Sequence, residues 1–272
     1  MSMDNNKEIL SPARKLYLKE LRRKNAWISF CKIFLILGLL LLWEVAGKLG
    51  WIDPFIMSQP SRIFRCIVNL YQQGDLIRHI VVSCLETIIG FLLGTCIGTF
   101  IATFLWWSPF LSNVLEPYLV ILNALPKVAL GPIIIVWVGA GQKAIIIMAL
   151  AISLIVTILE VFHGFITVDP EKVKLLRAMG ATRRQIFQKL IFPGNFPTII
   201  NSLKINVGLC WVGVIMGEFL VSKAGIGYLI VYGSQVFQMD LVMSSVMILT
   251  CAATIMYQGI VLLQKFLTKH IH

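Results

Sequence analysis

Acidic, basic and histidine side chains inside long apolar stretches are the residues of this sequence from which chemistry could come. Glu160 and His163 are three residues apart, so a helix places them on one face, with the ligand spacing of di-iron carboxylate bundles. Such bundles need further carboxylates and a second Glu-x-x-His pair, which the sequence does not contain. We therefore expect no metal site and no catalytic residues.

The sequence also lacks the residue patterns for cysteine-based sites and for ATP binding. The six cysteines are scattered without a Cys-x-x-Cys pair, so the sequence predicts neither a disulfide framework nor a zinc site. No Gly-x-x-x-x-Gly-Lys-Ser/Thr loop occurs, so the chain is not expected to cradle the phosphates of ATP or to bind a cofactor itself. If ATP supplies energy, ATP and magnesium must bind another polypeptide.

Lys127 is an ionisable residue inside an apolar stretch that two prolines and a glycine interrupt: Pro126, Gly131 and Pro132. A broken helix at membrane depth is tolerated where it is buried in protein or lines a wet cavity. Lys127 lies about ten residues into its expected span, residues 117–138. Ten helical residues rise roughly 15 Å, which brings Lys127 near the middle of a bilayer. A lysine there predicts a path for an anionic solute. The alternative is a lysine that reaches toward the interface or pairs with an acid.

The other charges in apolar stretches have structural interpretations beside functional ones. Glu160 and Lys204 are expected near the cytosolic ends of their helices, which favours a structural ion pair. Glu218 is expected near an outer end, where it could contribute to an outer gate; the alternative is simple solvation at the interface. Glu86 receives no specific role.

The elements that carry these residues are hydrophobic and long. Hydrophobic residues form 58% of the 272 residues and charged residues only 14%, whereas soluble domains carry about 25% charge. A bilayer crossing needs about 20 apolar residues. The sequence therefore predicts an all-α membrane protein with a transmembrane domain over residues 27–266. Its expected spans are 27–47, 80–106, 117–138, 144–165, 196–221 and 241–266.

Shorter segments flank and interrupt these spans. Residues 1–26 are polar and basic, without a small-residue cleavage site after the first span, so a retained signal anchor is expected. Residues 267–272 form a short tail. Between the first two spans, a short interfacial helix is predicted because several apolar residues fall on one helical face: Ile63, Phe64, Ile67, Val68 and Tyr71.

Positive charge predicts the orientation. The net charge of +11 could indicate nucleic-acid binding, but the lysines and arginines concentrate in residues 1–26 and 168–193. Charge placed in this way is typical of cytosolic segments beside anionic lipid. We therefore expect no nucleic-acid partner, and we place both termini and the 168–193 loop in the cytosol.

The 168–193 loop carries signals for two short helices. Asp169 is a good N-cap, and Pro170 suits the first helical position. Gly180 can end this helix in the left-handed conformation. Thr182 and Gln185 have capping-box spacing, so a second helix is expected to begin at once and to end before Pro193.

The same loop offers a surface that a soluble protein could bind. Leu175, Leu176 and Met179 form an apolar ridge, and nearby arginines can pair with carboxylates: Arg177, Arg183 and Arg184. The alternative is a pair of solvated surface helices without a partner.

This loop resembles the cytoplasmic signature of binding-protein-dependent ABC importer permeases. That signature is Glu-Ala-Ala, three residues, glycine, nine residues and Ile-x-Leu-Pro; here the glycine is Gly180 and the end is Leu190-Ile191-Phe192-Pro193. The Glu-Ala-Ala positions read Lys174-Leu175-Leu176, which departs from the family. The resemblance implies ATPase coupling through ten residues: Lys174, Leu175, Leu176, Arg177, Ala178, Gly180, Ala181, Arg183, Arg184 and Pro193.

Other segments are similar to the nitrate, sulfonate and taurine branch of these permeases. Residues 122–132 with Trp137-Val138-Gly139 resemble the branch's third span, and Trp211, Gly217-Glu218 and Gly225-Ile226-Gly227 resemble its fifth span and outer loop. The resemblance covers about residues 60–266. Together with the broken span, it gives these candidates for the solute path: Asn123, Pro126, Lys127, Trp211 and Glu218.

The resemblance implies an ATP-driven importer with a type I permease fold in the bacterial cytoplasmic membrane. Its expected partners are membrane lipid, a second permease copy or a paired permease, two cytosolic ATPase subunits and an extracytoplasmic solute-binding protein. The branch transports small anions such as sulfonates, taurine or nitrate, and also pyrimidine vitamin precursors. The alternatives are an ATP-independent channel or secondary carrier, and an intramembrane enzyme. The coupling loop disfavours the carrier, which would have no use for it, and inverted repeats are not evident.

Overall fold

The computed structural model describes residues 12–268, and helices form almost all of this part of the chain; no strand occurs in it. It divides into two units, with the boundary between residues 62 and 63. The all-α fold class predicted from hydropathy is confirmed. Five helices are long and apolar enough to cross a membrane, or six crossings result if one bent helix pair counts as a span.

The first unit contains one long helix, α1 (Pro12–Lys48), and the short helix α2 (Pro54–Met57). Residues 23–48 of α1 meet the length and hydropathy of a membrane span. At its end, the Glu44 carboxylate pairs with Lys48 Nζ at 3.1 Å and accepts a hydrogen bond from the Ser61 N–H at 3.1 Å. These contacts fix the turn by which the chain leaves α1.

The second unit begins within α3 (Pro60–Gln72), which is the helix that the sequence predicted between the first two spans. The long helices α4 (Asp75–Trp107), α7 (Gln142–Ile166) and α11 (Phe196–Val221) pack against one another. A Cβ on Gly213 of α11 would lie 2.5 Å from the Cα of Ala149 in α7, so the two helix backbones touch there. Small residues at the contact permit this approach, as in many membrane helix pairs.

The third predicted span is the main difference from the expected fold. Its helix α5 begins at Pro109, eight residues before the expected start at Pro117, and ends at Ala124. A 3₁₀ turn η1 (Lys127–Leu130) and helix α6 (Gly131–Val138) then continue at 90° to α5. The break lies at Leu125–Pro126, because Pro126 lacks the N–H that would continue the helix.

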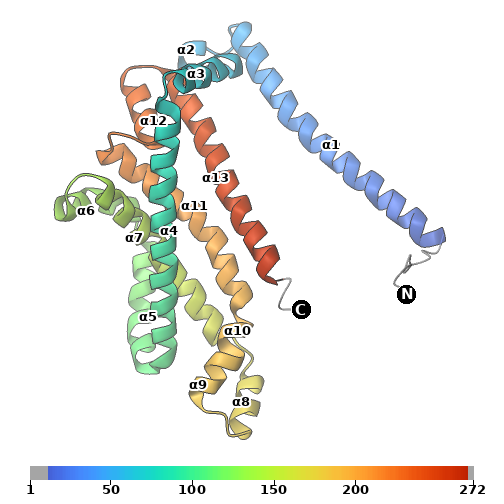
Figure 1. The fold of residues 1–272 in the computed structure, drawn as a ribbon, viewed down its shortest axis with the longest axis vertical. Coiled ribbons are helices and arrows are strands. Elements are labelled where there is room, and N and C mark those ends of the chain that lie inside the picture. The colour runs from blue at the N-terminus through green and yellow to red at the C-terminus, as the bar shows by residue number, and fades with distance from the viewer. Residues whose placement is uncertain (1–11, 269–272) are drawn as a thin grey trace, which may run out of the picture. The chain divides into compact units, whose positions relative to one another are not determined.

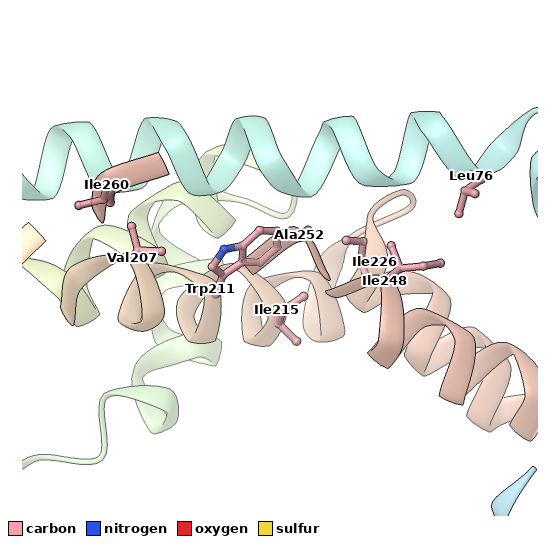
Figure 2. Packing of buried hydrophobic residues seen from close by; sticks show 8 residues of the cluster. All are labelled: Leu76, Val207, Trp211, Ile215, Ile226, Ile248, Ala252 and Ile260. Atoms are coloured by element: carbon pink, nitrogen blue, oxygen red, sulfur yellow. The ribbon is translucent and has the colours of Figure 1, made fainter. Parts of the chain in front are cut away.

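The remaining helices close the second unit. The helix α12 (Ile226–Gln235), which the sequence did not predict, precedes the last long helix α13 (Met239–Thr268). Apolar side chains of α4, α11, α12 and α13 form a buried cluster, shown in Figure 2, whose labelled members are Leu76, Val207, Trp211, Ile215, Ile226, Ile248, Ala252 and Ile260. Between α7 and α11 comes the segment α8 (Pro170–Ala178), α9 (Arg183–Ile186), η2 (Phe187–Ile191) and α10 (Phe192–Gly194). Figure 1 shows this segment at one end of the unit and α12 at the other.

Candidate functional site

The predicted signals of the 168–193 loop are present in the structure. The Asp169 carboxylate accepts the Glu171 N–H at 2.9 Å and caps α8. Gly180 has φ +82°, and the Ala181 N–H donates to the Leu176 carbonyl at 3.0 Å, which closes the helix end. A side chain beyond glycine is strained at this φ. Thr182 and Gln185 form the expected capping box at the start of α9.

The expected end of the second helix is wrong. The helical run does not stop before Pro193 but continues through the π-helical turn η2 and α10 to Gly194. Within it, the Phe192 N–H donates to the Phe187 carbonyl, five residues back. Pro193 has no N–H and crowds the preceding turn. The wider π turn immediately before Pro193 lets the helix continue through it.

Two of the three residues of the predicted apolar ridge are exposed on α8 and at its end. Leu175 is 62% exposed and Met179 is 74% exposed in the isolated chain. Leu176 instead packs on the buried cluster that includes Ile186 and Phe162. The ridge available to a partner is therefore Leu175 with Met179. Of the other coupling candidates, Ala181 is half-buried and the rest are exposed: Lys174, Arg177, Ala178, Gly180, Arg183, Arg184 and Pro193.

Arg183 is exposed, but its guanidinium contacts other residues of this chain. Its Nη2 donates a hydrogen bond of 2.9 Å to the backbone carbonyl of Trp106, at the end of α4. Its guanidinium carbon lies 5.1 Å from the Trp106 ring centroid and 5.8 Å from that of Trp107. That Arg183 pairs with a partner's carboxylates stays a prediction; within this chain its guanidinium contacts the Trp106 carbonyl and the two tryptophan rings.

Phe187 strengthens the same contact. Its ring centroid lies 4.9 Å from that of Trp106, 5.9 Å from Trp107 and 5.6 Å from Phe165 at the end of α7. A hollow of about 440 Å³ lies beside this aromatic group, and its lining includes Trp106, Phe165, Lys174, Arg177 and Arg183. The α9–η2 part of the loop is therefore packed onto the ends of α4 and α7.

The solute-path candidates on the broken span lie together. Lys127 Nζ donates to the Asn123 side-chain oxygen at 3.0 Å and to the Asn123 carbonyl at 3.1 Å. The ammonium thus satisfies a carbonyl left free at the end of α5, where Pro126 interrupts the helix. Lys127 follows a 16-residue helix, about 24 Å long, rather than ten residues of span. The alternative to a solute path is a Lys127 ammonium paired with a neighbouring acid. The ammonium is hydrogen-bonded as that alternative expects, but to the amide side chain of Asn123 and not to an acid.

Trp211 lies in a different place from these residues. It is 4% exposed, and its indole Nε1 has no hydrogen-bond partner in the described chain. It lines a groove of about 720 Å³ between α11 and α13. Apolar side chains line most of the groove, and its polar wall consists of Lys204, Thr250, Thr254 and Tyr257.

Glu218 is buried within the second unit, not solvated at an interface. It is 1% exposed; Ser83 Oγ and the Gly227 N–H donate to its two oxygens, each at 2.5 Å. Ser83 Oγ also accepts the Ile226 N–H at 2.7 Å. The alternative of interfacial solvation is wrong. The carboxylate holds the beginning of α12 against α4 and α11.

Neighbouring polar residues lie beside Glu218 and Ser83. His79 Nδ1 accepts the Gly225 N–H at 2.9 Å. Glu86 is also buried, and neither of its oxygens has a hydrogen-bond partner in residues 12–268. Sequence reasoning did not identify Ser83 or His79, because nothing local to α4 signals their contact with the start of α12.

The predicted ion pair of Glu160 with Lys204 is wrong. No ion pair joins the two in the described part of the chain, and Glu160 Oε2 is buried without a hydrogen-bond partner. His163 Nε2 lies 3.6 Å from Glu116 instead. No group of three or more potential metal ligands occurs among the described residues.

Comparison with known families and proteins gives a consistent result. Residues 94–272 match the family described as binding-protein-dependent transport system inner membrane component. The putative aliphatic sulfonates transport permease protein SsuC of Escherichia coli K12 is 29% identical over 215 residues, which cover 79% of this chain and 82% of that protein. The taurine transport system permease protein TauC of the same organism is 21% identical over 256 residues, with 91% and 93% covered.

Solved structures agree on the fold. A chain of a bacterial ABC transporter involved in the import of the acidic polysaccharide alginate gives a TM-score of 0.62 at 14% identity, covering 93% of this chain and 99% of that chain. A chain of the MetNI methionine ABC transporter in an inward-facing conformation gives 0.55 at 18% identity, covering 70% and 97%.

Proposed function

The chain belongs to the family of binding-protein-dependent transport system inner membrane components, and on this premise we propose how it works as the permease subunit of an ABC importer. Two copies form the membrane channel, a cytosolic ATPase binds α8 of each copy, and a small organic anion passes between the copies. An extracytoplasmic solute-binding protein delivers the anion. The permease itself performs no covalent chemistry.

The exposed face of α8 carries the proposal for ATPase binding. Leu175 and Met179 are large apolar side chains on a cytosolic segment, with no cover from this chain. The same segment carries four exposed cations: Lys172, Lys174, Arg177 and Arg184. An apolar pair with a basic rim is complementary to an apolar hollow with acidic edges on a soluble partner.

The α11 helix supports the pairing of two copies. Ile205, Gly208 and Val212 recur at three- and four-residue intervals on one face of α11, and all are exposed in the isolated chain. The groove with Trp211 opens beside this face, since Gly208 and Val212 also line it. A second copy against this face would enclose the groove as part of a central path.

The polar groups of the path favour an anion with an apolar part. Lys204 supplies a positive charge, and Thr250, Thr254 and Tyr257 supply hydroxyl groups, inside a largely apolar groove. Lys127 is a second cation on the broken span. Two relatives are named as transport permeases for aliphatic sulfonates and for taurine, which are anions with an apolar part. We therefore propose a sulfonate-type solute for this chain.

We propose that both termini and α8 face the cytosol. Single cysteines at the exposed positions Thr182 and Lys223, in a background without native cysteines, test this orientation. An impermeant maleimide should label Lys223→Cys in intact cells and Thr182→Cys only after permeabilisation. Labelling of Thr182→Cys in intact cells would refute the orientation.

ATPase binding is tested by placing a charge on the ridge. Met179→Asp should reduce the amount of ATPase that co-purifies with the permease by at least tenfold, because it buries a carboxylate in an apolar contact. Gln235→Asp at the exposed end of α12 adds the same charge at the other end of the unit and should retain the ATPase. Equal retention by both variants would remove α8 as the binding surface.

A further inference from the structure

Two neighbouring arginines of α9 have opposite environments. The side chain of Arg183 contacts the Trp106 carbonyl and both tryptophan rings, whereas the side chain of Arg184 has no hydrogen bond, ion pair or ring contact in the described part of the chain. Successive residues of a helix point about 100° apart, since a turn takes 3.6 residues. One arginine therefore faces this chain while the next is available to a partner.

The target of Arg183 is the corner between two membrane helices. Trp106 and Trp107 end α4, and Ser108 accepts the Leu111 N–H at 3.3 Å to begin α5. The Trp106 carbonyl belongs to the last turn of α4, where carbonyls lack helical partners and the helix dipole is negative. A guanidinium is suited to this place because it donates a hydrogen bond and stacks on aromatic rings at the same time.

The contact connects segments that are far apart in the sequence. Arg183 and Trp106 are 77 residues apart, and Phe187, one turn further along, packs on the same two tryptophans. The α8 helix contributes Val173 and Leu176 to the buried cluster near this corner, but Arg183 and Phe187 are the residues of the segment with a hydrogen bond or ring contact to Trp106 in the described part of the chain. A displacement of α8–α9 by a partner would therefore reach the α4–α5 corner through Arg183 and Phe187.

We propose that Arg183 is a positioning residue that transmits movement of the coupling segment to the α4–α5 corner, and that it is not an ATPase-binding residue. This inference rests on the proposed function, because a partner must move α8 for the contact to matter. From the corner, movement of α5 would displace the broken end of the span, which holds Asn123 and Lys127.

The test compares Arg183→Gln with the adjacent control Arg184→Gln in the purified complex of permease, ATPase and solute-binding protein. Three quantities are measured: the ATPase retained per permease, the rate of ATP hydrolysis, and the response of a spin label to vanadate trapping. The label is placed on α5 at Ile121→Cys, an exposed position, in a background without native cysteines. It reports movement of α5 directly and requires no knowledge of the solute.

Arg183→Gln should retain the ATPase within twofold of wild type, while the spectral change per assembled complex falls at least fivefold. Arg184→Gln should lower ATPase retention, while each complex that does assemble responds as wild type does. Trp106→Leu removes the ring under Arg183 and the ring contact with Phe187 but keeps the backbone carbonyl, so it should also lower the response while the ATPase is retained. Because the two side chains touch, the effects of Arg183→Gln and Trp106→Leu should not add in the double variant.

Two results would overturn the inference. One is a parallel loss of ATPase and of the spin-label response in Arg183→Gln, since that is the behaviour of a binding residue. The other is a full response in Arg183→Gln. If Arg183→Gln does not accumulate, the comparison is made with Arg183→Lys and Arg184→Lys. Only Arg183→Lys should show a reduced spin-label response with full ATPase retention. Equal responses of the two variants would refute the positioning role of Arg183. Failure of the wild-type chain to retain any ATPase would instead refute the proposed function.

Discussion

Ala149 of α7 lies between a glycine of α4 and a glycine of α11, and this arrangement makes a pair of opposite predictions. A Cβ added to Gly90 would lie 2.8 Å from the Ala149 Cβ, while its next neighbour, a backbone oxygen, would be 3.7 Å away. A Cβ added to Gly213 would lie 2.5 Å from the Ala149 Cα and 2.9 Å from the Ala149 nitrogen. The first clash involves a removable methyl group and the second involves backbone.

The distances set the expected cost. Carbon atoms in contact prefer about 3.5–4.0 Å, so either alanine must push two helices apart by roughly 1 Å. Overpacking of this kind costs about 1–3 kcal/mol, or roughly 2–12 °C in the midpoint of thermal unfolding for a chain of this size. Gly259→Ala serves as the control, because no atom lies within 4 Å of its added Cβ.

Ala149→Gly distinguishes the two clashes. In an Ala149→Gly background, Gly90→Ala should no longer lower the unfolding midpoint, whereas Gly213→Ala should lower it as much as before. Thermal unfolding of the purified chain in detergent, followed by tryptophan fluorescence, measures both differences. Rescue of Gly213→Ala, persistent loss in Gly90→Ala, or losses no larger than that of Gly259→Ala would refute the described packing of α4, α7 and α11.

Three further predictions concern single residues. Glu218→Ala should destabilise the chain by about 2–4 kcal/mol, because the Gly227 N–H and the Ser83 hydroxyl lose a buried acceptor; Glu116→Ala, which breaks a half-exposed pair, should cost less than about 1 kcal/mol in the same unfolding assay. Gly180→Val should insert in the membrane but release the ATPase in co-purification, because φ +82° is strained for a β-branched residue; a co-purifying, fully stimulated ATPase would contradict it. Lys127→Met should cut taurine or alkanesulfonate uptake per assembled complex at least tenfold with basal ATP hydrolysis unchanged, and Lys127→Arg should keep part of the uptake; undiminished uptake by Lys127→Met would remove Lys127 from the solute path.

Local signals in the sequence predicted local structure well. The caps at Asp169 and Thr182 and the helix end at Gly180 depend on side chains and backbone within a few residues of each other, so their spacing was sufficient. Long apolar stretches likewise identified α4, α7, α11 and α13. The π turn before Pro193 was missed because proline usually ends a helix, and a local widening of the turn is not visible in residue types.

Contacts between distant segments could not be predicted. Whether Arg183 faces a partner or Trp106 depends on where the α4–α5 corner lies, and no spacing within the loop encodes that position. The burial of Glu218 similarly requires Ser83 on another helix and the turn at Gly227. Charge alone therefore overestimated the exposure of Glu218 and did not reveal the contact of Arg183 with Trp106.

Uptake by proteoliposomes tests the central claim most directly. The purified permease is reconstituted with its ATPase and solute-binding protein, and uptake of radiolabelled taurine and of an alkanesulfonate is followed with ATP, with a non-hydrolysable analogue, and without the binding protein. The account predicts uptake of at least one of the two anions that requires both ATP hydrolysis and the binding protein and stops in Gly180→Val. Uptake at the same rate without ATP would contradict it and would favour a channel or secondary carrier.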